Sequence, residues 1–154
     1  MSGTIDARLT ALGVTLPEAP MPAANYVPFV ISGKMLYVSG QISADENGLI
    51  LGKLGADKDV VSGAAAARRC ALSLLAQAKA ACDGDLDRIA RVVKLVGFVN
   101  STPEFTEQPK VVNGASDLMV EVFGDKGRHA RSAVSAASLP LGVAVEVEAV
   151  FELV

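Results

Sequence analysis

The segment near the end of the chain constrains the fold most. Residues 143–152 read Val-Ala-Val-Glu-Val-Glu-Ala-Val-Phe-Glu, so apolar side chains recur at every second position. Successive side chains of a β-strand point to opposite faces of a sheet. The pattern therefore predicts a strand with one wholly apolar face, and with Glu146, Glu148 and Glu152 on the other face beside Val150.

Other segments have the spacing of amphipathic helices. The Ala-rich run from Val60 to Cys82 contains no proline, and its apolar residues recur at every third or fourth position. Asp59 is a suitable N-cap, and Gly84 follows as a stop signal. A second helix is predicted over Asn113–Phe123, and a short one over residues 4–12.

The remaining apolar segments predict further strands. Phe29–Ile31 and Met35–Ser39 flank Ser-Gly-Lys, which is typical of a β-hairpin. Ile89–Val99 is β-branched and apolar at both alternating positions, which predicts a central strand buried on both faces. Arg131–Ser138 predicts another strand, and Leu49–Leu51 a short one.

Two long helices are too few to cover both faces of this sheet. The apolar fraction agrees, because it is 51%, or about 59% when glycine is counted and tyrosine is not, against a usual 45–50%. A chain of 154 residues suits one domain, here residues 1–154, with 1–25 as a helical extension and Pro-rich connector. We therefore expect an α+β domain whose mixed sheet carries two main helices on one face and meets other copies through the second face.

Charge and cysteine content exclude several classes of protein. The net charge is −3 and no basic run exceeds Arg68-Arg69, so nucleic-acid binding through phosphate neutralisation is not expected. Cys70 and Cys82 would lie about 18 Å apart on one helix, beyond disulfide reach, which predicts buried thiols in a reducing compartment. No apolar run is long enough for a membrane span and no signal peptide is recognisable, so we expect a cytoplasmic protein.

The densest polar cluster of the chain is Arg128-His129-Ala130-Arg131-Ser132. An arginine on a cleft-lining strand suits a carboxylate, because its planar fork donates two parallel hydrogen bonds. Glu146 is a candidate for activating water. The alternatives are a surface ion pair for Arg131 and a solvated strand face for Glu146. His129 is the single histidine and zinc motifs are absent, so neither a metal nor another cofactor is expected.

Several short motifs carry a resemblance to a known family. They are Tyr26, Tyr37-Val38-Ser39-Gly40-Gln41-Ile42, Asn113, Ala130-Arg131-Ser132, Leu139-Pro140 and Glu146-Val147-Glu148-Ala149. Their order and spacing resemble the Rid/YjgF family, whose members are also called L-PSP endoribonucleases. The resemblance runs from about Tyr26 to Val150, and Gly-Arg-His-Ala-Arg-Ser-Ala is similar to a longer branch of the family.

The resemblance implies a chorismate-mutase-like fold, assembled as a homotrimer with clefts between subunits. It implies hydrolysis of 2-imino or 2-enamino acids to 2-keto acids and ammonia, without a cofactor. In that reaction Arg131 would hold the substrate carboxylate and Glu146 would orient the attacking water, and both would lie on the sheet face that meets the other subunits. The same cleft would be lined by Tyr26, Gly40, Asn113 and Ala133.

One position departs from the deaminases of the family. Ala133 stands where they typically carry cysteine, so any role of a thiol is lost, while the backbone groups that touch substrate are kept. Two other functions stay open: a non-catalytic trimer that binds small carboxylates or acts as a stress-related binding protein, and an endoribonuclease. The acidic charge and the single histidine weigh against the endoribonuclease.

Overall fold

The predicted C-terminal strand, β7 (Val145–Leu153), is the middle strand of the main sheet in the computed structural model, which describes residues 3–22 and 24–154. The sheet has five strands in the order β1-β2-β7-β5-β6. All neighbours are antiparallel except β5 and β6, which run parallel, so the sheet is mixed as expected. The other strands are β1 (Phe29–Ser32), β2 (Met35–Ile42), β5 (Ile89–Asn100) and β6 (Ala130–Ala136).

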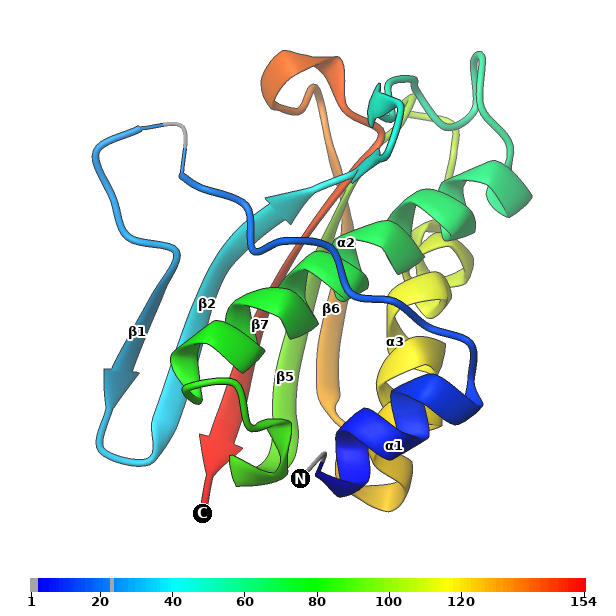
Figure 1. Cartoon of the computed structure of the whole chain (residues 1–154). Helices are drawn as coiled ribbons and strands as arrows, with labels where there is room; N and C mark the ends of the chain where they lie inside the picture. Colours follow the sequence, from blue (N-terminus) through cyan, green and yellow to red (C-terminus); the bar gives the residue numbers. More distant parts are fainter. Residues whose placement is uncertain (1–2, 23) are drawn as a thin grey trace.

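The two long helices lie side by side on one face of the sheet (Figure 1). They are α2 (Val60–Ala81) and α3 (Gln108–Phe123), and the core lies between them and the sheet. Asp59 caps α2 as predicted, in a reciprocal capping box with Ser62. The short helix α1 (Thr4–Ala11) packs beside α3. The predicted α+β class with two main helices on one face is therefore confirmed.

A connector leads from α1 to β1, and its described residues form neither helix nor strand, as the prolines predict. It crosses the outer side of α2 (Figure 1), where the Gln77 side chain donates to the carbonyl oxygen of Pro20. Further along the chain there is a small second hairpin and there are three single-turn helices. They are β3 (Ala44–Asp45), β4 (Gly48–Leu49), η1 (Leu86–Arg88), η2 (Gly124–Gly127) and η3 (Pro140–Gly142).

The start of α3 was predicted too late. The helix begins at Gln108 rather than Asn113, because Pro109 falls in its first turn, where the missing N–H breaks no helical hydrogen bond. Both cysteines are free and buried in the core, as predicted. Within the described ranges, no helix has the length and apolar character that crossing a membrane requires.

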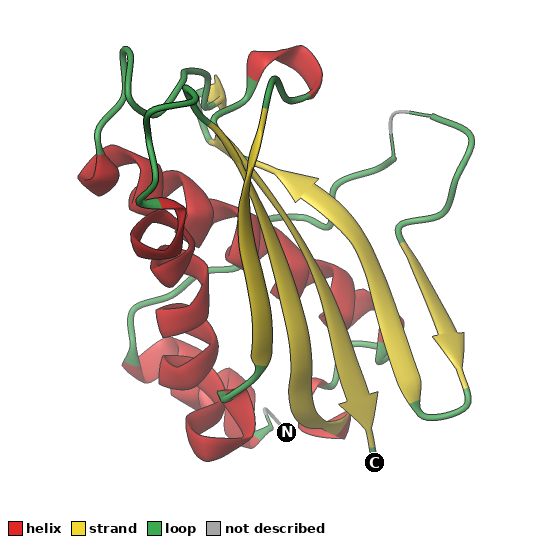
Figure 2. Cartoon of the chain, turned by 180° about the vertical axis from the view of Figure 1, so that it is seen from behind, coloured by secondary structure: helices red, strands yellow, loops and turns green. Residues whose placement is uncertain are grey.

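The second face of the sheet is bare. No helix of the described chain covers it (Figure 2), and along β5 the side chains of Lys94 and Phe98 point to this face and are not buried. The prediction that Ile89–Val99 is buried on both faces is therefore wrong for a single chain, because helices cover only one face. Phe98 and Val150 leave apolar surface there, among charged groups such as Glu148.

Helices α2 and α3 touch at Gly114, where an added methyl group would overlap the backbone carbonyl of Ala64. We expect Gly114→Ala to lower the free energy of unfolding by about 1–3 kcal/mol, because overpacking separates the helices. At an exposed helical position the same change would stabilise the protein by about 1 kcal/mol. Thermal unfolding followed by circular dichroism should show a fall of roughly 3–10 °C. Asp117→Ala, at an exposed position of α3, is the control, and an unchanged Tm for Gly114→Ala would refute the close-contact argument.

Candidate functional site

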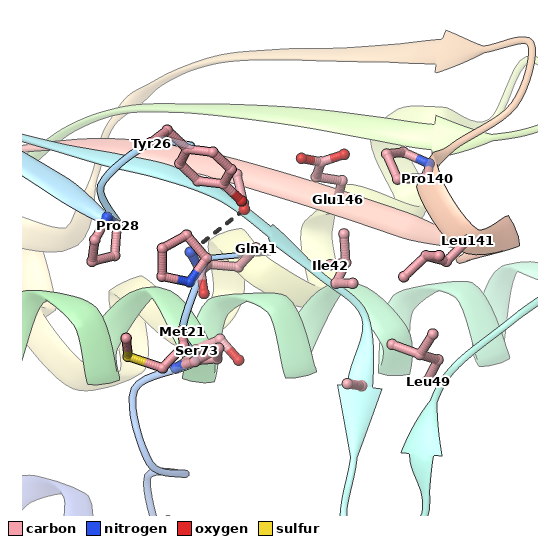
Figure 3. A pocket seen from close by; sticks show the side chains of 14 residues that line it. Met21, Tyr26, Pro28, Gln41, Ile42, Leu49, Ser73, Pro140, Leu141 and Glu146 are labelled. Carbon is pink, nitrogen blue, oxygen red and sulfur yellow. Dashed lines mark hydrogen bonds between the residues drawn. The ribbon is translucent and has the colours of Figure 1, made fainter. Parts of the chain in front are cut away.

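A cavity beside β2 collects three of the six residues singled out from the sequence. Tyr26, Gly40 and Glu146 line it, and its volume is about 460 Å³ (Figure 3). Tyr26 comes from the end of the connector, Gly40 from β2 and Glu146 from β7. The rest of the lining is mainly apolar and includes Met21, Ile42, Leu49, Pro140 and Leu141.

A break in the pairing of β2 with β7 positions the Glu146 carboxylate. The register shifts between Val38 and Gln41, which places Gly40 in an irregular part of the strand. A methyl group on Gly40 would overlap the carboxylate of Glu146 in its present position, so a side chain here would displace that carboxylate. The glycine of the Ser-Gly-Gln motif thus leaves space for the Glu146 carboxylate in the cavity.

The Glu146 carboxyl is half-buried, and its pKa is raised above the ordinary value for glutamate. The main cause is burial, which disfavours the charged form, and the negative charge of Glu148 adds to it. The pKa of the Cys70 thiol, beneath the same strand, is raised as well, mainly by its burial and also by the charge of Glu146. A carboxylate with a raised pKa is a stronger base than an ordinary one, which suits it to take a proton from water.

The other three residues lie at the far edge of the sheet. Arg131 and Ala133 are on edge strand β6 and point to the side of the sheet that faces α3, where Asn113 lies. The Arg131 guanidinium donates through Nη1 to Asn113 Oδ1 at 2.8 Å and to Ser116 Oγ at 3.1 Å, and through Nη2 to the carbonyl of Pro109 at 3.4 Å. These acceptors are all neutral.

No carboxylate lies within ion-pair distance of Arg131 in the described parts of the chain. The surface ion pair considered for this residue is therefore not formed. Three hydrogen bonds use Nη1 twice and Nη2 once, which leaves Nε–H and one Nη2–H as donors without a partner among the described residues. Arg131 is thus a fixed cation with donors to spare.

Ser116 and His129 extend this cluster, and the sequence interpretation missed their pairing. His129 Nδ1 lies 2.6 Å from the carbonyl of Gly127, so Nδ1 carries a proton, and in the neutral form of the ring Nε2 is an acceptor. Ser116 Oγ, 2.9 Å from Nε2, then donates to His129 while it accepts from Arg131. The spacing of Asn113 and Ser116, three residues apart on one helix face, is a signal that was available in the sequence.

One chain keeps the two halves of the site apart. Glu146 pairs with Phe98, and Phe98 pairs with Val134 of β6, three residues beyond Arg131. Glu146 and Arg131 are thus two strand spacings apart across the sheet and three residues apart along it. This places their backbones about 14 Å apart. Glu146 also leaves the sheet on the bare side and Arg131 on the helix side. The expectation that one sheet face carries both residues is therefore wrong, because Arg131 shares the buried side of its neighbour Leu95.

Across the described ranges, no group of three or more His, Cys, Asp or Glu side chains is arranged to hold a metal ion. The chemical groups of the candidate site are therefore the fixed guanidinium of Arg131 and the basic carboxylate of Glu146, which lies beside an apolar cavity.

Comparison with known proteins identifies a family that matches this chain. Residues 6–153 match the family described as "YjgF/chorismate mutase-like, putative endoribonuclease". Protein TCP17 of Trypanosoma cruzi is 56% identical over 154 residues, which are 99% of this chain and 96% of that protein. The crystal structure of Atu1372 from Agrobacterium tumefaciens, a protein of unknown function, is 53% identical with a TM-score of 0.90, and the match covers 97% of this chain and 92% of that one. A structure named as a putative endoribonuclease from Shewanella oneidensis is 40% identical with a TM-score of 0.93, over 98% and 100% of the two chains.

Proposed function

The chain belongs to the YjgF/chorismate mutase-like family, and on this basis we propose that it hydrolyses 2-imino and 2-enamino acids to 2-keto acids and ammonia. The observation that carries the proposal is the Arg131 guanidinium, held by neutral acceptors and without an acidic partner in the described chain. Its remaining donors on Nε and Nη2 suit the two oxygens of a planar carboxylate. Such a carboxylate is common to all 2-imino acids.

Glu146 supplies the base in this proposal. A protonated imine carbon is already electrophilic, so the protein mainly has to orient the substrate and activate water. Glu146 takes one proton from water as the oxygen bonds to C2, and it returns this proton to the nitrogen of the resulting carbinolamine. The C–N bond then breaks with its electron pair on nitrogen, and the hydroxyl proton passes to the departing ammonia, which leaves a 2-keto acid and ammonium.

We infer that a complete site needs two subunits. Within one chain the backbones of Arg131 and Glu146 are about 14 Å apart on opposite sides of the sheet, which is too far for one small substrate. In our proposal Glu146 therefore works with Arg131 of the partner subunit. A contact between two different surfaces of identical chains closes into a ring, and a homotrimer is the ring we expect. The bare sheet face, with its apolar Phe98 and Val150, supports such an association.

The direct test generates 2-iminobutanoate or 2-iminopropanoate in place with an amino-acid oxidase and follows its decay. We expect the pure protein to accelerate release of the keto acid and ammonia in proportion to its concentration. If the decay rate is unchanged at any protein concentration, the proposal is refuted.

Mixing two impaired variants, assayed at a substrate concentration well below the KM of the Arg131→Ala variant, tests the shared site. Arg131→Ala and Glu146→Gln subunits, unfolded together and refolded as mixed trimers, are expected to recover activity, because a wild-type pair forms wherever an intact Arg131 meets an intact Glu146. Random mixing of equal amounts should restore about a quarter of the wild-type sites, one in each mixed ring. The same variants refolded separately are the control. No recovery in verified mixed trimers would mean that each chain builds its own site.

Ser116 is expected to act as a positioning residue for Arg131. Ser116→Ala removes one of the acceptors that hold the guanidinium, so we expect KM to rise about tenfold while kcat changes little, since a hydrogen bond to a charged group contributes about 1.5–3 kcal/mol. Steady-state kinetics with one imine separates the two constants. Ser116→Thr, which keeps the hydroxyl, should restore KM, and an equal fall of kcat in both variants would contradict a positioning role.

The family description also favours a second candidate, an endoribonuclease. The single histidine is already engaged by Gly127 and Ser116, which argues against a histidine acid–base pair. RNA cleavage that survives both Arg131→Ala and Glu146→Gln would belong to another site. Retained binding of 2-keto acids with no turnover of any imine would instead favour a non-catalytic carboxylate-binding protein.

A further inference from the structure

The cavity beside β2 is larger than the smallest imino acids need. Its volume is about 460 Å³, within the range of about 300–1,000 Å³ of pockets that hold drug-sized molecules. The imine of alanine has only a methyl side chain beyond its reacting carbon and carboxylate. Most of the space next to Glu146 is therefore left for a larger substrate side chain.

The chemistry of the lining indicates what that side chain is. Glu146 is the one charged residue among the residues that line the cavity. In Figure 3, Tyr26 and Glu146 lie on one side of the cavity, while Met21 and Leu49 lie on the opposite side. An apolar group gains free energy on leaving water for such a lining, whereas an anionic group loses hydration that no cation of the lining replaces.

The backbone of one part of the wall opposite Glu146 is restrained. The segment Pro20–Pro22 forms part of it, and the prolines restrict its backbone. Gln77 of α2, only 1% exposed, donates from Nε2 to the carbonyl oxygen of Pro20 at 2.5 Å and ties the segment to the helix. A cavity wall held in this way needs less ordering when a ligand binds, which favours affinity for a ligand that fits it.

We propose that this cavity is a side-chain pocket, and that the 2-imino acids taken by this protein carry a large apolar side chain, branched aliphatic, thioether or aromatic. This inference rests on the proposed deamination and gives it a substrate class. The substrate carboxylate is bound outside the pocket by Arg131 of the partner subunit, because the pocket itself holds no cation. Imino acids with an acidic side chain are rejected, since a second carboxylate would enter an apolar space beside Glu146.

Competing imines test the proposal. Imines generated from L-leucine, L-methionine and L-phenylalanine are each expected to show a kcat/KM at least about tenfold above that of the alanine imine, because one methylene in an apolar pocket changes kcat/KM by about 10–200-fold. The imine of L-glutamate, close in length to that of methionine, is the charge control and should be the poorest of the long substrates. An alanine imine turned over as well as the leucine imine would overturn the inference.

A variant that fills the apolar end of the cavity gives a second test. Leu49 is 43% exposed on the small β3–β4 hairpin, so Leu49→Trp places bulk in the apolar end without disturbing the core. We expect the ratio of kcat/KM for the phenylalanine imine over the alanine imine to fall at least about tenfold. Val61→Trp, at an 80% exposed position of α2 outside the cavity lining, is the control and should leave that ratio unchanged. An unchanged ratio in Leu49→Trp would contradict a side-chain pocket.

Equilibrium binding separates failure of this inference from failure of the proposed function. The dissociation constants of pyruvate, 4-methyl-2-oxopentanoate and phenylpyruvate are measured by calorimetry, without any turnover. Tighter binding of the two larger keto acids with no deamination would support the pocket and refute the deaminase. Turnover of imines with equal affinity for all three keto acids would support the deaminase and refute the pocket.

Discussion

Replacing Arg131 by alanine is expected to lower kcat/KM for every 2-imino acid about a thousandfold. The variant removes a charge-assisted, two-point contact to the carboxylate, and truncating one partner of such a pair costs about 2–5 kcal/mol or more. Most of the effect should fall on KM, because the carboxylate is bound equally in the ground state and the transition state. Initial rates with imines generated in place, together with calorimetric titration of pyruvate, measure both consequences.

Two further arginine variants make this result specific. Arg131→Lys keeps the charge but not the planar fork, so its kcat/KM should lie between those of the wild type and Arg131→Ala. Arg128→Ala removes a neighbouring exposed arginine that pairs with Asp125 at 3.4 Å, and it should stay within about twofold of the wild type. Wild-type kinetics in Arg131→Ala would exclude this residue as the carboxylate anchor.

The sequence predicted the elements well because their signals are local. The two-residue period of β7, the Asp59 cap of α2 and the Ser-Gly-Lys turn between β1 and β2 each depend on a few neighbouring residues. The sequence also predicts that one face of the sheet is uncovered, since two long helices are too few to cover both faces. The late start predicted for α3 has a local cause too, because the apolar stripe of Leu118, Met119 and Val122 does not extend to the first turn, in which Pro109 falls.

The arrangement of the site depended on information that is not local. Strand periodicity puts Arg131 and Ala133 on a common face, but it does not tell which side of the sheet the helices cover. The register of β6 against Leu95 of β5 decides this, and it turns Arg131 away from Glu146. A lone glutamate on an uncovered strand face is more typical of a solvated surface. That holds for exposed Glu148, whereas Glu146 is half-buried in the cavity, where its carboxylate lies against Gly40.

Replacing Glu146 by glutamine is expected to lower kcat about 10²–10⁴-fold, the usual contribution of a general base. The amide keeps the shape of the side chain but cannot take a proton from water. Affinity for 2-keto acids should stay near the wild-type value, because the carboxylate of the ligand is bound by Arg131. Single-turnover rates and calorimetry on the same preparation separate the two effects, and unchanged turnover in this variant would exclude Glu146 as the base.

The dependence of kcat/KM on pH in the wild type should reflect the ionisation of the Glu146 carboxyl group. Only ionised Glu146 accepts a proton, so activity is present above its pKa and is lost as the pH falls through it. Because burial and the charge of Glu148 both raise this pKa, the loss should begin at a higher pH than for an ordinary glutamate. Glu148→Gln removes the neighbouring charge and should shift the acid limb of kcat/KM to lower pH, while Glu146→Gln should abolish the limb. A limb that persists in Glu146→Gln and ignores Glu148→Gln would belong to another group or to the substrate imine, and the base would then have to be sought elsewhere in the cleft.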